Sequence, residues 1–404
     1  MADLQVAPPG EPTMSKILEL RPTLHFQPDL DAHAALEDDG IDALIAGRRH
    51  FLAERILLDR LERDADDPAR LASHLTRLIQ VYLVDRSLEL AEPVLERLRE
   101  VPGASEAATE MERAIDREKR LLSRARVTHF PNMLTSFDDF EQLVDRYLLE
   151  GYGEEPLFDR RDKIMAFGSC FAQNIARRLV EAGFDAFQTP VNDMLNTTFH
   201  LRDVVEWATG GTRSGLVDRI EAEMGLETAD DMRRYFMESD VFVFTVGLSV
   251  GNVATRQPDG SVASTYRPFT VEENVQNLLR IVERIQTVRP NANVFLTVSP
   301  VPLHNAMQPY SAIEMDCISK STGRVSVHEV VSRGIPGVRY WPSYEIVRWL
   351  NPMLPVPLFG LDDGNARHVS REMVEFITDR FIARYSKPAA AVSSQRPPIG
   401  LDLV

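Results

Sequence analysis

Two patterns of apolar residues divide this chain. From about Ala32 to Arg124, apolar residues recur at three- and four-residue spacing, which is typical of amphipathic helices. Beyond Val127, short runs are apolar at nearly every position: Ile164–Phe167, Asp240–Val246, Asn293–Val298 and, more weakly, Gly337–Trp341. Such runs predict strands covered on both faces, and therefore a parallel sheet between helices. Helical spacing predicts the helices Val271–Val288, about Met315–Arg333 and Ser370–Tyr385.

These patterns predict four parts. Residues 1–25 are Pro-rich and aperiodic and are expected to be a disordered tail, as is the segment 387–404. Residues 26–125 are expected to form an all-α domain, and residues 126–386 an α/β domain. No cluster of catalytic residue types occurs in the helical part. We therefore expect it to be a scaffold or a docking surface.

The helical part contains an internal echo. Leu58-Asp59-Arg60-Leu61 recurs 37 residues later as Leu95-Glu96-Arg97-Leu98, and each copy follows an Ala-Glu pair. Asp67-Pro68 is expected to start the helix between the copies, because Pro is tolerated in a first turn. This period favours a helix-hairpin repeat resembling the tetratricopeptide class. A plain helical bundle is the equally weighted alternative.

Composition narrows the function. The 404 residues are 44% hydrophobic and 26% charged, and the net charge of −16 disfavours nucleic acid and anionic lipid as partners. No apolar run reaches the ~18 residues that span a bilayer, and no secretory signal is visible. Two cysteines fit a reducing cytoplasm and provide neither a disulfide framework nor a structural zinc site. No glycine-rich phosphate loop is present, so we expect no cofactor and no metal.

Ligands of open α/β sheets bind beyond the carboxyl ends of the strands, so the residues there are the candidates for chemistry. Ser169 follows the first strand, where a turn into a helix projects its hydroxyl above the sheet and helix N–H groups suit an oxyanion. Serine is also a common helix N-cap, and the turn alone favours that interpretation. Cys170 is the rival nucleophile, although a buried thiol beneath the turn is the simpler expectation.

Further candidates lie beyond the other strands and before the last helix. His368, preceded by Asp362 and Asp363, suits a general base whose ring a carboxylate orients. A surface loop with an incidental histidine is the alternative. The second and third strands are followed by two groups of possible oxyanion or pocket residues, Gly247 and Ser249 after one and Ser299 after the other. His304 is a rival base in a proline-framed loop.

Several segments together resemble one family. Gly168-Ser169-Cys170-Phe171-Ala172 is the pentapeptide that names the GSCFA family. In family order there follow segments similar to Thr297–Leu303, Ser319-Lys320-Ser321 (a helix start), Trp341–Ile346 and His368-Val369-Ser370. The resemblance covers roughly residues 128–386. The family is generally grouped with the SGNH/GDSL hydrolases, which implies a flavodoxin-like sheet with Ser169 as nucleophile and His368 as base.

Two positions depart from the superfamily pattern. Its acid stands three residues before the histidine, where this chain has Asn365, so Asp363, or less favourably Asp362, takes the role, or the site is a dyad. Its Gly-x-Asn block is here Gly247-Leu248-Ser249. The side-chain donor to the oxyanion would then be Ser249, Asn252 or Asn192.

The resemblance implies a serine esterase or O-acyltransferase that works through an acyl-serine intermediate, and we expect O-acetylated glycans or a small ester as substrate. The alternative is an adaptor that binds a glycan or acyl ligand in the cleft without turning it over. In both cases we expect the helical domain to bind a protein partner or a second copy of itself. The shifted acid and the missing amide favour the adaptor, whereas the serine–histidine pair favours the enzyme.

Overall fold

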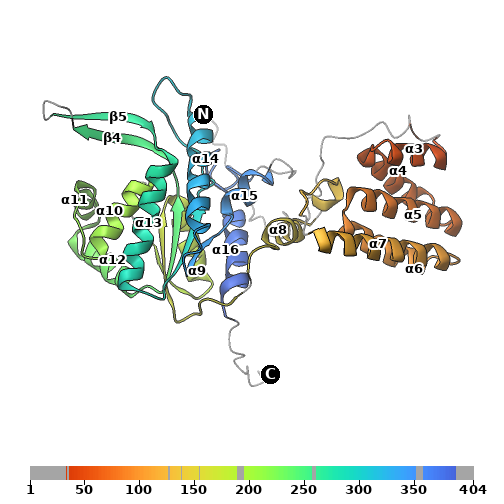
Figure 1. Cartoon of the computed structure of the whole chain (residues 1–404), viewed down its shortest axis with the longest axis horizontal. Helices are drawn as coiled ribbons and strands as arrows, with labels where there is room; N and C mark the ends of the chain where they lie inside the picture. The colour runs from red at the N-terminus through yellow and green to blue at the C-terminus, as the bar shows by residue number, and fades with distance from the viewer. Residues whose placement is uncertain are drawn as a thin grey trace, which may run out of the picture. The chain divides into compact units, whose positions relative to one another are not determined.

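A computed structural model describes residues 33, 36–125, 128–137, 139–153, 155–188, 195–256, 261–351 and 358–387. The described residues form two compact units (Figure 1). Residues up to Tyr152 belong to a helical unit, and Gly153–Asn351 with residues 358–387 belong to an α/β unit. Both tails expected to be disordered lie outside the described residues, apart from Lys387.

The helical unit is a series of helices in which chain neighbours pack together. Its elements are α3 (Asp38–Ala46), α4 (His50–Arg63), α5 (Pro68–Asp85), α6 (Leu88–Glu100), α7 (Ser105–Ala125), the 3₁₀ turn η1 (Leu134–Phe137), α8 (Phe140–Val144) and the π turn η2 (Asp145–Leu149). The expected start of α5 is confirmed, because the Asp67 side chain accepts hydrogen bonds from the N–H groups of Ala69 and Arg70. Leu61 and Leu98, from the two copies of the echo, are both buried in the core.

The segment after α7 packs on these helices. Met133 is fully buried in the same hydrophobic core, the Thr135 hydroxyl contacts the buried Glu54 carboxylate, and the Tyr147 hydroxyl contacts Glu89. The helical unit therefore extends to Tyr152, beyond the boundary at residue 125 that the sequence indicates. The apolar positions of this short segment have no long period of their own, so the sequence does not show which unit buries them.

The α/β unit is built on a five-stranded parallel sheet with the order β2-β1-β3-β6-β7. The strands are β1 (Lys163–Gly168), β2 (Asp185–Gln188), β3 (Val241–Val246), β6 (Asn293–Val298) and β7 (Val338–Tyr340). Gly168 is in register with Thr245, and Thr245 with Thr297, so one row crosses three strands near their carboxyl ends. The strand order reverses between β1 and β3, because β2 lies on one side of β1 and the later strands lie on the other. Open α/β sheets bind ligands at such a point.

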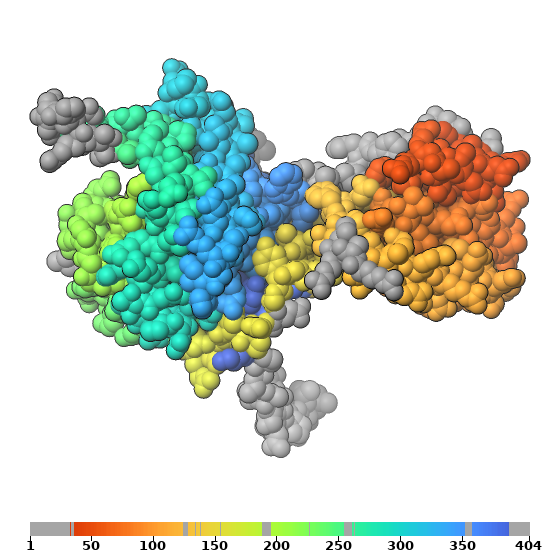
Figure 2. Space-filling view, viewed as in Figure 1, coloured from red at the N-terminus to blue at the C-terminus, as the bar shows by residue number. Residues whose placement is uncertain are grey.

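Helices cover both faces of this sheet (Figure 1). On one face lie α9 (Cys170–Glu181) and α16 (Arg371–Tyr385), whose Phe381 ring contacts Phe295 at 4.8 Å. On the other lie α12 (Leu226–Glu238), α13 (Val271–Val288) and α14 (Ala312–Val331), with α10 (Thr198–Ala208) and α11 (Gly215–Met224) outside them, and the short α15 (Ser343–Arg348) follows β7. In the space-filling view, α13 and α14 form one continuous surface (Figure 2). The sheet is thus buried on both faces, as its continuous apolar runs predict.

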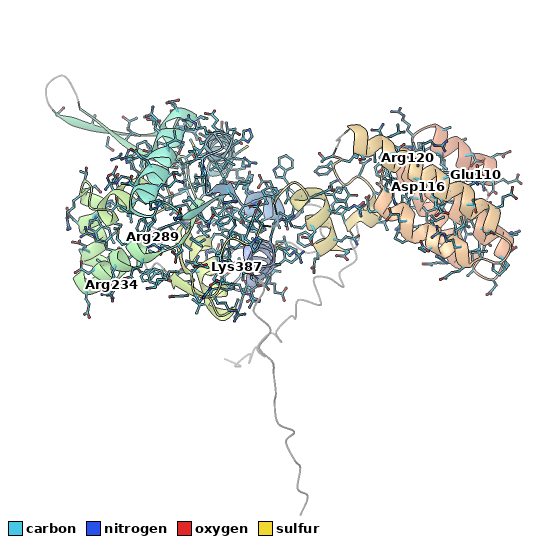
Figure 3. All side chains as sticks on the ribbon, turned by 60° about the horizontal axis from the view of Figure 1, so that its bottom comes forward. Glu110, Asp116, Arg120, Arg234, Arg289 and Lys387 are labelled. Atoms are coloured by element: carbon cyan, nitrogen blue, oxygen red, sulfur yellow. The ribbon has the colours of Figure 1, made fainter. Side chains whose placement is uncertain are left out.

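The amino and carboxyl ends of the strands have different surroundings. At the amino ends, Asp240 accepts a hydrogen bond from the Lys163 N–H and contacts Arg289, the residue labelled in Figure 3. Near the carboxyl end of β3, the chain turns through Ser249 into an antiparallel hairpin of β4 (Val250–Arg256) and β5 (Val262–Pro268). No helix among the described residues is long and apolar enough to cross a bilayer.

Most expected elements of the α/β unit are present. The expected strands match β1, β3, β6 and β7 to within one or two residues, and α13 and β6 have the expected bounds. α14 begins at Ala312, close to the expected start near Met315, so Ser319-Lys320-Ser321, which resembles a family helix start, lies inside this helix. Ser311 provides the N-cap, because its hydroxyl accepts from the Glu314 N–H. The hairpin and β2 were not expected, because neither has a continuous apolar run.

Candidate active site

A glycine makes the turn between β1 and α9 possible. Gly168 has φ +127°, and a Cβ there would lie 2.2 Å from both the carbonyl oxygen and the hydroxyl oxygen of Thr245. Any other residue would therefore clash with β3 and strain the backbone. The close approach of the two strands places Ser169 at the end of β1, next to the side chain of Thr245.

Ser169 is buried, with 5% of its surface exposed. Its Oγ donates to Ser299 Oγ at 3.0 Å, lies 3.4 Å from Thr245 Oγ1 and accepts from the Phe171 N–H at 3.3 Å. Its own N–H donates to Thr245 Oγ1 at 3.0 Å. Ser169 therefore caps α9, and hydroxyls from two neighbouring strand ends, those of β3 and β6, meet around its Oγ.

Cys170 is the first residue of α9 and is partly exposed. The expectation of a buried cysteine beside an exposed serine is therefore wrong. Ser169 turns inward because its hydroxyl satisfies the helix N-terminus and the hydroxyls of Thr245 and Ser299.

His368 lies in a loop that folds back on itself before α16. The Gly360 N–H donates to the His368 carbonyl at 2.9 Å, and the His368 N–H donates to the Asn365 carbonyl at 2.8 Å. The imidazole is 45% exposed, and its Nδ1 lies 2.6 Å from Asp363 Oδ2. This contact is the main reason that the pKa of Asp363 is lowered, so the carboxylate stays ionised at neutral pH.

Asn365, which stands at the position of the superfamily's acid, and Asp362, the less favoured acid, have other roles. Asn365 Nδ2 lies 3.3 Å from His368 Nε2, and Asp362 accepts the Arg371 N–H at the start of α16. An amide N–H directed at Nε2 fits the tautomer in which Nδ1–H is donated to Asp363, which leaves Nε2 as the basic nitrogen. Of the two acids, Asp363 is the one in contact with the imidazole.

Ser169 and His368 are not hydrogen-bonded to each other in the described part of the chain. The serine hydroxyl is directed at Ser299, and the histidine Nε2 at Asn365. A proton transfer from Ser169 to His368 therefore requires both side chains to leave these partners. Catalytic hydrogen bonds are often loose in a ligand-free site and tighten when substrate binds.

The segment Gly247-Leu248-Ser249 lies at the carboxyl end of β3 against Asn196. A Cβ on Gly247 would lie 2.8 Å from the Asn196 carbonyl oxygen and 3.2 Å from its Oδ1, and the Leu248 N–H donates to that carbonyl at 2.6 Å. The half-buried Asn196 side chain therefore lies against Gly247, although the segment Gly247-Leu248-Ser249 itself has no asparagine. Asn196 is a side chain of the kind that donates to oxyanions.

Ser249 has a different role from the expected one. It is fully buried, and its Oγ lies 3.1 Å from where a Cβ of Gly323 on α14 would be. Its N–H donates to Ser319 Oγ at 2.7 Å. The Ser249 hydroxyl thus lies against α14, and it has no hydrogen-bond partner among the described residues.

Two further expected residues, Asn252 and His304, do not join this cluster. Asn252 is exposed on β4, paired with Tyr266 of the hairpin. His304, the rival base, is also exposed. Asn192 lies outside the described residues.

The sequence does not indicate Asn196 or Lys320 as site residues. Asn196 has the appearance of an ordinary loop residue before the helix cap Thr197. Lys320 is 1% exposed, and its Nζ donates to the Gly247 carbonyl at 2.6 Å. A lysine within a helix usually faces solvent, so the resemblance of Ser319-Lys320-Ser321 to a family segment is the one signal in the sequence for this position.

In the part of the chain that the structure describes, no group of three or more His, Cys, Asp or Glu side chains is arranged to hold a metal ion. No curated protein matches the chain. The profile of the GSCFA family matches residues 163–381, from the first residue of β1 to the middle of α16, and so includes Ser169, Lys320 and His368. That match covers more than half of the 404 residues, and the chain belongs to the GSCFA family.

Proposed function

We propose that this protein is a serine esterase or O-acyltransferase with an SGNH-like site. The observation that carries the proposal is the convergence on Ser169 Oγ of hydroxyls from the ends of β3 and β6, at the point where the strand order reverses. The order β2-β1-β3-β6-β7 is also that of flavodoxin-like sheets. The Asp363–His368 pair supplies a base with an oriented ring.

The reaction follows from these groups. Ser169 Oγ attacks the acyl carbon as its proton passes to His368 Nε2, and the imidazolium then protonates the departing alcohol. Water or a sugar hydroxyl then attacks the acyl-Ser169 ester and gives its proton to the same nitrogen, which returns the proton to Ser169 Oγ as the acyl group leaves. The Asn196 amide and the N-terminus of α9 are the candidate donors to the oxyanion, and a small ester such as an O-acetyl group on a sugar is the proposed substrate class.

Turnover of an aryl acetate tests this proposal. We expect Ser169→Ala to abolish turnover and His368→Gln to lower kcat by about 100- to 10,000-fold. Cys170→Ala and His328→Gln are the matched controls, since His328 is an exposed histidine on α14. Loss of activity in Cys170→Ala with retention in Ser169→Ala would assign the nucleophile to the thiol.

A binding adaptor is the second candidate, favoured by the engagement of Ser169 with Ser299 rather than His368. The helical unit would then carry the partner-binding role as a tetratricopeptide-like module. Its α7 presents Glu110, Asp116 and Arg120 to solvent, where Figure 3 labels them. A folded chain that binds an acetylated sugar without releasing acetate would favour this candidate over the enzyme.

A further inference from the structure

Lys320 is a buried cation at the carboxyl edge of the sheet. It lies on α14 with 1% of its surface exposed, and its Nζ donates to the carbonyl of Gly247, two residues beyond Thr245. Thr245 in turn holds the N–H of Ser169. A series of contacts at the end of β3, through Thr245 and Gly247, thus connects the proposed nucleophile Ser169 to the ammonium group of Lys320.

Stability does not explain this lysine. Among the described residues, the hydrogen bond to Gly247 is its sole one, and no carboxylate oxygen lies within 4.0 Å of Nζ. The nearby Asp316 carboxylate is held by Arg348 and by the Leu303 N–H. A buried charge without an ion-pair partner destabilises a fold, and an apolar side chain of similar volume would pack there without that penalty.

Lys320 belongs to a three-point attachment of the segment Gly247-Leu248-Ser249. Lys320 holds the Gly247 carbonyl, its neighbour Ser319 accepts the Ser249 N–H, and the Asn196 carbonyl accepts the Leu248 N–H. Two adjacent residues of α14 therefore fix one side of the segment, and the residue with the candidate oxyanion amide fixes the other. The position of Asn196 relative to Ser169 depends on this attachment.

We infer that Lys320 is a positioning residue of the acyl-transfer site, whose ammonium group holds the Gly247 carbonyl and keeps a positive charge beneath the place where the oxyanion forms. This inference rests on the proposed function. Positive charge fixed in a dry site stabilises developing negative charge far more than it would in water.

The ammonium group of Lys320 should make kcat depend on pH. Burial lowers the pKa of Lys320 to about 8, against the opposing effects of Asp316 on its own helix and Cys170 on α9, and Arg348 on α15 lowers it further. The ammonium form therefore predominates below about pH 8 and is lost above it. If the charged form is the active one, kcat falls as the pH rises through this range.

The test is the pH profile of aryl acetate turnover for the full chain and for Lys320→Met. We expect Lys320→Met to lower kcat by about 10- to 100-fold at pH 7 with KM within about threefold, and to remove the alkaline fall in kcat. Ser319→Ala breaks the neutral part of the same attachment, so it should lower kcat but keep the alkaline fall. Ser326→Ala removes a buried hydroxyl elsewhere on α14 and should change neither kcat nor the profile.

Each outcome separates the two proposals. An alkaline fall that persists in Lys320→Met, with Ser169 still required for turnover, overturns the role of Lys320 and leaves the proposed function in place. A KM effect with unchanged kcat also overturns it, because the charge would then serve substrate binding. Absence of turnover in the folded, unaltered chain overturns both proposals.

Discussion

Replacing Lys320 with methionine should make the α/β unit more stable while making the site less active. The folded environment lowers the pKa of this lysine from 10.5 to about 8, chiefly through burial. Such a difference corresponds to about 3 kcal/mol of destabilisation when the group is protonated in both states. Loss of the hydrogen bond to Gly247 offsets about 1 kcal/mol of this gain, so Lys320→Met should raise the free energy of unfolding by about 2 kcal/mol at pH 7.

The sign of the pH dependence follows from the same values. Below about pH 8 the folded and unfolded chains both carry the proton, so the destabilisation is present in full. Between about pH 8 and 10.5 the folded chain has lost the proton and the unfolded chain still holds it, so the unaltered protein gains stability as the pH rises. The advantage of Lys320→Met should therefore shrink over this range, vanish before its upper end and become a deficit of about 1 kcal/mol there, because the hydrogen bond to Gly247 is still missing.

Urea unfolding followed by tryptophan fluorescence measures this difference. All three tryptophans, Trp207, Trp341 and Trp349, lie in the α/β unit, so the signal follows this unit alone. Subtracting the two variants at each pH cancels the titration of every other group. A variant that is less stable than the unaltered chain at pH 7, or a difference that does not change with pH, would refute the argument that Lys320 is an unpaired buried charge.

Three other variants test the geometry of the site. Gly168→Ala should lower the free energy of unfolding by more than about 3 kcal/mol because its Cβ meets Thr245, whereas Gly225→Ala, with φ +82° and open space, should lower it by about 1 kcal/mol; urea unfolding distinguishes them. Thr245→Val should cost about 1–3 kcal/mol in the same assay, since the Ser169 N–H is left unpaired. Asp363→Asn should lower kcat on an aryl acetate far more than Asp362→Asn, because only Asp363 contacts the imidazole; equal small effects would indicate a dyad.

Much of the α/β framework could be predicted because its strands are buried on both faces. The runs at β3 and β6 are apolar at nearly every position, so both the strands and a parallel sheet follow from the sequence. β2 has only the four residues Asp185–Gln188 and lies at the edge of the sheet, where burial imposes no continuous apolar run. The strands of the hairpin, β4 and β5, also lack a continuous apolar run, so the sequence does not indicate them.

The site was less accessible to sequence reasoning than the sheet. Ser169, Ser299 and the Asp363–His368 pair stand at element ends, where position along the chain indicates position at the sheet edge. The direction of each side chain does not follow from position. Ser249 is directed at α14, and Cys170 is more exposed than Ser169.

Lys320 and Asn196 show a further limit. Each meets Gly247 from a segment about 50 or more residues away in the chain, Lys320 from α14 and Asn196 from the residue before the cap of α10. A charged residue in a helix and an amide in a loop are both ordinary surface features in a sequence. Only the packing of α14 and α10 against the end of β3 distinguishes them from such features.

The central claim is that Ser169 is a nucleophile activated by His368, and covalent labelling tests it most directly. The full chain is incubated with a fluorophosphonate, which phosphonylates activated serines, and the modified peptide is identified by mass spectrometry. We expect Ser169 to be labelled in the unaltered chain and in Cys170→Ala, and no labelling in Ser169→Ala. Labelling should be much slower in His368→Gln than in His328→Gln. Labelling confined to another residue, or no labelling of a folded chain, would contradict it.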